Sequence, residues 1–243
     1  MKHSVSIETL TFDQVHLGVP DPGAAAQWYV RHLGAAPGDN FDRIWFGPAR
    51  VIFLKNEAPA PSRGAAIDHF ALSCTDVRAE VAALDGSGAR VTTAVSEAPG
   101  LGRYAYVEDP WGARIQLVEE PGAPRFHHVH LQVPDPAATR GWYLERFGGE
   151  RAALKGTLDG IRYGDVWLFL DRGANEPSRG HAIDHIGFRM PDLLARAAAL
   201  KTMGGLTFTT DPKPGPPGAF SPALMSFAED PWGVKIELLQ RRA

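Results

Sequence analysis

The sequence is poor in cysteine, with Cys74 as its single thiol among 243 residues. One cysteine excludes a disulfide within the chain. It also excludes iron–sulfur and zinc sites that are built on several thiolates. A chain without disulfides suits a reducing compartment, so a cytoplasmic location is expected.

Long apolar runs and an excess of one charge are also lacking. No apolar run approaches the roughly 20 residues that span a bilayer, and Met1 to Leu10 has no apolar core of a secretion signal. The 25 basic and 28 acidic side chains give a net charge of −3, without the clustered basic face that neutralises nucleic-acid phosphates. The sequence therefore predicts a soluble globular protein that binds neither membranes nor nucleic acids.

What the sequence does contain is an internal repeat. Three segments of the first half match three of the second half in the same order: 15–34 with 129–148, 61–69 with 177–185, and 108–117 with 229–238. Prolines and a glycine gather at 120–124, between two strand-like runs. Two domains are therefore expected, at 1–121 and 122–243.

The hydrophobic pattern of the second copy predicts mixed secondary structure. Alternation predicts strands at 126–133 and 183–190, and helical spacing predicts helices at 137–147 and 192–203. Short apolar strands are expected at 166–170, 223–227 and 234–239. Each copy is thus interpreted as two βαβββ units, which gives four units in an α+β chain.

Three motifs of the second copy point to a known family: HVHLQVPD at 128–135, DHIGF at 184–188 and DPWGVKIEL at 230–238. With their counterparts in the first copy, they resemble the vicinal oxygen chelate superfamily, which includes glyoxalase I, extradiol dioxygenases and bleomycin-resistance proteins. The resemblance implies paired βαβββ units that curl into half-barrels, one per copy. It also implies a divalent metal on the concave face.

Matched residue by residue, the family's ligand positions fall on His128, His185 and Glu237. Strand alternation places the three on polar faces, opposite apolar residues. Two imidazoles and one carboxylate suit one divalent ion; Fe(II) is favoured, and Mn, Co, Ni or Zn would also fit. The equivalent residues of the first copy are Gln14, His69 and Gln116. Because these include no anion, the first domain is expected to be metal-free.

Other interpretations of the polar residues stay open. The three ligands would also fit a hydrogen-bonded set without metal. His130 is either an acid/base group beside the ligands or, like its equivalent His16, a structural residue. The Pro-rich segment 211–222 is either a lid over the site or a tolerated surface loop.

The resemblance implies several chemistries. Glyoxalase I-like enzymes use a fourth ligand, a Glu on a strand that is apolar here. Asp171 is a candidate substitute, but it lies late in the strand, which counts against glyoxalase I activity. Extradiol dioxygenases use three ligands with a His and a Tyr, both absent from 206–229. Their layout of an inert first and a metal-bearing second copy favours a dioxygenase-like enzyme with a small-molecule substrate. The alternatives are a lyase or isomerase and a metal-free drug-binding protein. In each case the chain is expected to be a monomer or a homodimer.

Overall fold

The computed structural model describes residues 9–38, 40–122, 124–173, 176–217 and 221–242. Most of Met1–Leu10, which was expected to contain no secretion signal, lies outside these residues. Part of the segment 211–222 also lies outside them. Four helices are described: α1 (Pro22–Leu33), α2 (Val77–Ala83), α3 (Pro136–Phe147) and α4 (Leu193–Met203). Within the described residues, no helix is long and apolar enough to span a membrane.

The strands of the first copy are β1 (Thr11–Val19), β2 (Ala36–Pro37), β3 (Arg43–Phe46), β4 (Ala49–Lys55), β5 (Ile67–Cys74), β6 (Arg90–Ala98), β7 (Gly102–Glu108) and β8 (Arg114–Glu119). Those of the second copy are β9 (Arg125–Val133), β10 (Glu150–Leu154), β11 (Leu158–Tyr163), β12 (Val166–Arg172), β13 (Ile183–Arg189), β14 (Thr207–Pro214), β15 (Leu224–Glu229) and β16 (Lys235–Gln240). The α+β class and the four βαβββ units are confirmed.

The helices begin where the sequence offers a cap. Aspartates precede all four helices, and the side chains of Asp21 and Asp135 each accept two backbone N–H groups of the first turn. A proline follows each of these two aspartates, at a position where the missing N–H costs nothing. Helix α1 ends at Gly34, whose left-handed backbone (φ 68°) suits a residue without a Cβ.

The sheets combine units from both copies, which differs from the expected one half-barrel per copy. The first sheet has the order β14-β15-β16-β13-β1-β4-β3-β2, and the second has the order β10-β11-β12-β9-β5-β8-β7-β6. Thus the first unit of the chain joins the fourth through the antiparallel pair β1·β13. The second unit joins the third through β5·β9. The boundary at 121–122 separates the sequence repeats but does not separate the two sheets.

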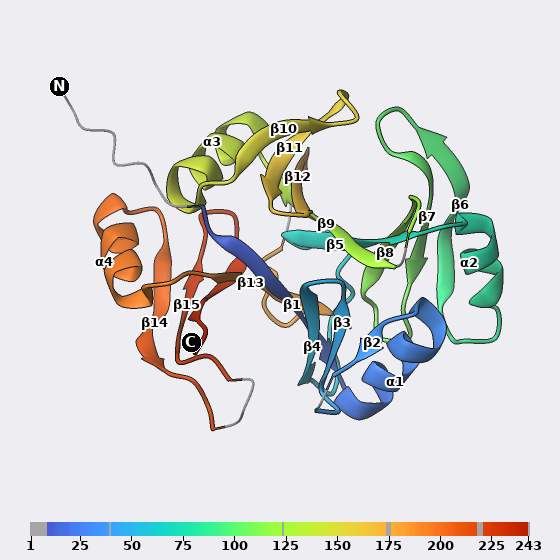
Figure 1. Ribbon diagram of the computed structural model, residues 1–243, viewed down its shortest axis with the longest axis horizontal. Helices are drawn as coiled ribbons and strands as arrows, with labels where there is room; N and C mark the ends of the chain where they lie inside the picture. The colour runs from blue at the N-terminus through green and yellow to red at the C-terminus, as the bar shows by residue number, and fades with distance from the viewer. Residues whose placement is uncertain (1–8, 39, 123, 174–175, 218–220, 243) are drawn as a thin grey trace.

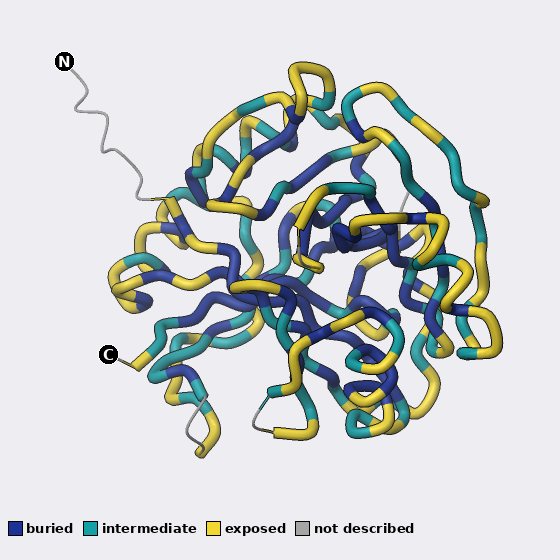
Figure 2. Tube along the Cα trace, turned by 45° about the vertical axis from the view of Figure 1, so that its right-hand side comes forward, coloured by how far each residue is buried: buried dark blue, intermediate teal, exposed yellow. Residues whose placement is uncertain are grey.

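The helices lie on the outside of the molecule and each covers strands of its own unit (Figure 1). The buried residues run mainly through the interior of the molecule, and the exposed ones lie mainly in its outer loops (Figure 2). In the interior, Phe126 of β9 stacks on Phe12 of β1 and on Phe70, with ring centroids 5.2 and 5.5 Å apart. One continuous apolar core therefore joins the two sheets.

One hydrogen bond in each copy connects the two sheets, and the two bonds occupy equivalent positions. Tyr29 of α1 donates to Asp109 in the β7–β8 turn (2.7 Å), and Tyr143 of α3 donates to Asp230 in the β15–β16 turn (2.8 Å). Burial raises the pKa of each aspartate from 3.8 to about 6. The folded state therefore binds these two protons more tightly than the unfolded chain does.

This shift predicts a pH effect on stability. A carboxyl whose pKa is raised by folding stabilises the folded state fully when the pH is below its pKa in the unfolded chain. This stabilisation is lost as the pH rises through about 6. Relative to wild type, the double variant Asp109→Asn/Asp230→Asn should therefore gain free energy of unfolding between pH 4 and pH 7. Urea unfolding at unit pH steps measures the difference. If the free energies of unfolding of the two proteins changed in parallel with pH, the raised pKa of Asp109 and Asp230 would be contradicted.

Candidate functional site

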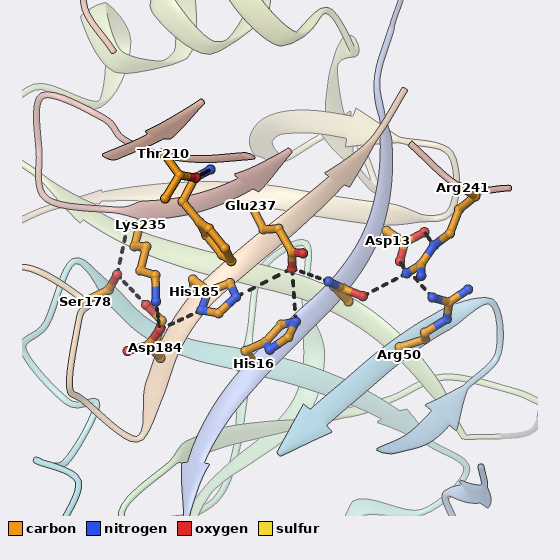
Figure 3. Close-up of polar contacts among 12 residues, drawn as sticks. Asp13, His16, Arg50, Ser178, Asp184, His185, Thr210, Lys235, Glu237 and Arg241 are labelled. Atoms are coloured by element: carbon orange, nitrogen blue, oxygen red, sulfur yellow. Dashed lines mark hydrogen bonds and ion pairs between the residues drawn. The ribbon is translucent and has the colours of Figure 1, made fainter. Parts of the chain in front are cut away.

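The structure brings together two of the three predicted ligands and separates the third. His185 on β13 and Glu237 on β16 lie on adjacent strands of the first sheet, while His128 on β9 lies in the second sheet. The strand on the other side of β13 is β1, which supplies Gln14 and His16. The predicted set His128, His185 and Glu237 is therefore corrected: His16 stands with His185 and Glu237 (Figure 3).

The three side chains of this trio converge on one buried point. The Nε2 atoms of His16 and His185 lie 3.2 and 3.6 Å from Oε2 of Glu237, and the two imidazole rings stack at 4.0 Å. All three residues are buried. Apart from these ion-pair contacts with Glu237, neither Nε2 atom has a hydrogen-bond partner among the described residues. Two buried imidazole nitrogens that converge on a carboxylate resemble the ligand set of a divalent metal ion.

Gln14 approaches Glu237 across a glycine. Gln14, Gly187 and Glu237 form one row across β1, β13 and β16. A Cβ at position 187 would lie only 2.7 Å from Cγ of Gln14, so the row needs a residue without a side chain. The Gln14 amide nitrogen donates to Oε2 of Glu237 at 2.5 Å, and its oxygen accepts from Arg241 at 3.0 Å. Gln14 thus orients Glu237.

A β-bulge orients His185. The pairing of β1 with β13 jumps from His16↔His185 to Leu17↔Ile183, which leaves Asp184 as the extra residue. Oδ1 of Asp184 lies 2.6 Å from Nδ1 of His185 and accepts from Lys235 at 2.5 Å. A carboxylate on one ring nitrogen fixes the tautomer and leaves the other nitrogen, Nε2, free to bind.

The electrostatics of the trio favour a neutral imidazole and an ionised carboxyl. Burial, followed by the nearby His185, lowers the pKa of His16 to about 4. Burial alone would raise the pKa of Glu237, but close contacts with His16 and His185 hold it well below its ordinary value. At neutral pH, His16 therefore has a lone pair available for a metal ion, and Glu237 contributes a negative charge.

The trio lines a cavity of about 300 Å³. Apolar side chains of Ile52, Leu54, Met225 and Phe227 form much of the wall, and Arg43, Lys235 and Arg241 add basic groups. Pro216, Ser221 and Pro222 also line the cavity, so the described part of the Pro-rich segment borders the site, while its residues 211–214 belong to β14.

The position of a fourth ligand is apolar. Strand β4, which runs parallel to β1, places Ile52 opposite His16, and Leu54 follows on the same face. Asp171, considered as a substitute, belongs to the second sheet and lies 3.1 Å from Nε2 of His130. Ile52 and Leu54 offer no ligand atom, so a metal site with three protein ligands stays a prediction.

His128 and His130 take part in a separate cluster. His69 of β5 faces His130 of β9 in register, and these three histidines form a second group of converging, buried ring nitrogens. His130 therefore lies beside His128, its predicted neighbour, but in the other sheet from His185 and Glu237. The first copy was expected to be metal-free. Among the described residues, however, each group of potential ligands contains side chains from both copies.

The sequence signal that could have identified His16 was its equivalence to His130. Both follow the family's first ligand position by two residues on the same strand face. The missing information was the pairing of the units, which decides whether His16 or His130 faces His185.

Comparisons with known proteins agree with this fold. A model of the Glyoxalase/Bleomycin resistance protein/Dioxygenase superfamily matches residues 11–117 and again 125–238. The Arabidopsis thaliana protein named "Probable lactoylglutathione lyase, chloroplastic" is 28% identical over 168 residues, which is 63% of this chain. The match spans about half (47%) of that relative's length.

Solved structures show the same architecture. Glyoxalase I from Zea mays superposes with a TM-score of 0.74 at 20% identity, covering 96% of this chain and 92% of the other. A candidate dioxygenase from Bacillus subtilis has a TM-score of 0.65 at 16% identity, with 97% and 86% covered. These likenesses establish the fold and leave the reaction to the site itself.

Proposed function

Because the chain belongs to the Glyoxalase/Bleomycin resistance protein/Dioxygenase superfamily, we propose that it is a metal-dependent lyase or isomerase. Its substrate is a small organic molecule bound through neighbouring oxygens. The sequence alone favoured a dioxygenase, but the match to a protein named as a lyase supports the alternative better. In this proposal His16, His185 and Glu237 hold the metal.

One observation carries the proposal: two buried Nε2 atoms, which make no hydrogen bond to the described residues, converge on one buried carboxylate on the wall of a cavity. Burying such polar atoms costs free energy unless a partner satisfies them. A divalent ion would satisfy all three at once. When bound, it would polarise substrate oxygens and stabilise an enolate-like anion.

The chain's own residues prepare this chemistry. Asp184 holds the tautomer of His185, and Gln14 holds Glu237 in place. His16 is uncharged at neutral pH, because its pKa is lowered to about 4, and it also has an unpartnered Nδ1. Pro216 and Pro222 line the cavity and cover part of it with apolar surface.

The cavity wall favours a small, anionic substrate. The three basic side chains of the wall (Arg43, Lys235 and Arg241) each pair with an aspartate (Asp42, Asp184 and Asp13), so the net positive charge comes from a bound dication that faces the single charge of Glu237. A volume of about 300 Å³ is at the lower end of ligand pockets, which span about 300–1,000 Å³. Small hydroxy or oxo acids fit these conditions best.

The test uses the purified chain loaded separately with nickel, zinc, manganese, cobalt and, without oxygen, iron. Small oxo and hydroxy acids and lactoylglutathione, which the Arabidopsis relative's name mentions, are assayed for isomerisation or lyase turnover. Turnover that needs metal and is lost in His185→Ala supports the proposal. Tight substrate binding that is equal with and without metal, and unchanged in His185→Ala, would instead indicate a metal-free binding protein.

A second candidate, a dioxygenase, is favoured by the ligand set itself. Two histidines and one carboxylate with open positions are typical of non-haem Fe(II) enzymes that activate oxygen. Oxygen uptake with a catechol by the iron-loaded protein, without turnover by the nickel or zinc forms, would favour this candidate over the lyase.

The role of Asp184 gives a prediction on metal affinity. Asp184→Asn should lower the affinity of the trio for its metal by about 10–100-fold, because the partner of a metal-binding histidine fixes its orientation and basicity. Competition with a colorimetric chelator measures the affinity. The matched control is Asp68→Asn, which changes the equivalent partner of His69 in the other sheet and should leave the trio's affinity unchanged. Equal affinity in wild type and Asp184→Asn would show that the tautomer of His185 is fixed by another group.

A further inference from the structure

We propose that the second sheet contains another metal site, formed by His69, His128 and His130. Their converging ring nitrogens all lie within 4.8 Å of one another, and all three residues are buried. The ring centroid of His69 lies 5.6 Å from that of His128 and 4.7 Å from that of His130. Three imidazoles at this spacing match the three protein ligands of a metal site with one open position.

Partners on the opposite ring nitrogens orient two of the three imidazoles. Nδ1 of His69 lies 2.7 Å from Asp68, and Nδ1 of His128 lies 2.7 Å from Nδ1 of His127. His127 in turn places its Nε2 3.6 Å from Glu120. The Nε2 atoms of His69 and His128 have no hydrogen-bond partner among the described residues. An imidazole held at one nitrogen and open at the other is arranged as a metal ligand.

The fold supplies this arrangement through its own repeat. Asp68 occupies a bulge between β5 and β9, as Asp184 does between β13 and β1, so each sheet re-aims one histidine in the same way. Across β9, β5 and β8, the row His128, Ala71 and Gln116 stands where the other sheet has Gln14, Gly187 and Glu237. The second sheet thus has an additional imidazole where the first has an amide, and an amide where the first has a carboxylate.

This exchange predicts the class of ion. Three neutral imidazoles favour borderline metals such as zinc, nickel and copper over magnesium or manganese, which prefer oxygen ligands. Asp171 stands at the open side, with Oδ2 3.1 Å from Nε2 of His130 and with 67% of its side chain exposed. It can rotate towards solvent and leave His130 free, or it can approach the ion as a fourth ligand.

The site also joins the two copies. His69 comes from the first copy and His128 and His130 from the second, at the antiparallel pair β5·β9 in the middle of the sheet. An ion bound there would connect two strands that only folding brings together, so the free energy of unfolding should rise with the logarithm of the ion concentration.

The experiment counts zinc per chain by elemental mass spectrometry after equilibration with excess zinc and dialysis. The expected result is two ions for wild type, one for His128→Ala, one for His185→Ala and none for the double variant. The control His181→Ala, which changes a histidine outside both groups, should keep two. A count of one for wild type that is lost in His185→Ala but kept in His128→Ala would overturn the proposal without affecting the proposed function.

A second measurement needs no variant and so does not depend on the folding of the histidine mutants. Zinc is added to ¹⁵N-histidine-labelled wild type, and the imidazole resonances are followed by NMR. The proposal expects the Nε2 signals of His69 and His128 to shift with saturation at one equivalent per site. Unchanged signals for both histidines at saturating zinc would overturn it.

Discussion

Glu237→Ala is expected to remove the metal from the cavity and to lower kcat/KM by about 1,000-fold or more. Glu237 is the one anion among the three converging ligands, and its Oε2 lies within 3.6 Å of both imidazoles. Without it the ion would lose a ligand and the charge that balances it. A metal ion stabilises developing charge by several kcal/mol, and about 1.4 kcal/mol corresponds to a tenfold change in rate.

Two further variants separate charge from shape at this position. Glu237→Gln keeps the size of the side chain but removes its charge, so it should lose most of the metal while the fold is kept. Gln116→Ala changes the equivalent residue of the other sheet and should leave activity unchanged. Full metal content and activity in Glu237→Ala would show that the trio is not the active centre.

Asp13→Ala is expected to lower the free energy of unfolding by about 3–5 kcal/mol, the usual cost of removing one partner from a buried ionic group. Asp13 is buried on β1, where Arg241 contacts it closely and Arg50 lies 3.4 Å away (Figure 3). Without the carboxylate these guanidinium groups lose their common partner. Arg241 would also be less fixed as a donor to Gln14, so metal affinity should fall as well.

Chemical unfolding at neutral pH measures this effect, with Glu57→Ala as the control. Glu57 forms an exposed pair with Lys55, so its removal should cost less than about 1 kcal/mol. If Asp13→Ala were as stable as Glu57→Ala, the buried cluster would contribute little to folding. The connection from Asp13 through Arg241 and Gln14 to Glu237 would then be unimportant.

Local features of the fold follow from the sequence. Alternating residues on β9 and β13 defined both the strands and the faces that carry His128 and His185. The aspartate-capped helices were expected within a few residues of their bounds. Glu237 also lies on a strand that was expected from the sequence, because the DPWG turn before it marks where that strand begins.

The pairing of the four units could not be read from the sequence. Because the two copies are homologous, β1 and β9 have similar sequences. The same edge of β13 could therefore pair with either strand. Residue patterns therefore do not distinguish a partner in the same copy from one in the other. The choice decides whether Gln14 and His16 or His128 and His130 stand beside His185. The bulges at Asp68 and Asp184 could not be predicted from the sequence either, because a bulge depends on how two strands pair.

The most direct test of a metal centre built from both copies is anomalous diffraction from metal-loaded crystals, measured at the absorption edge of the bound ion. The structure predicts an anomalous peak between β1, β13 and β16, at about 2.0–2.2 Å from ligand atoms of His16, His185 and Glu237. If the metal is present in the crystal and no peak lies at these three side chains, the account of the site is contradicted.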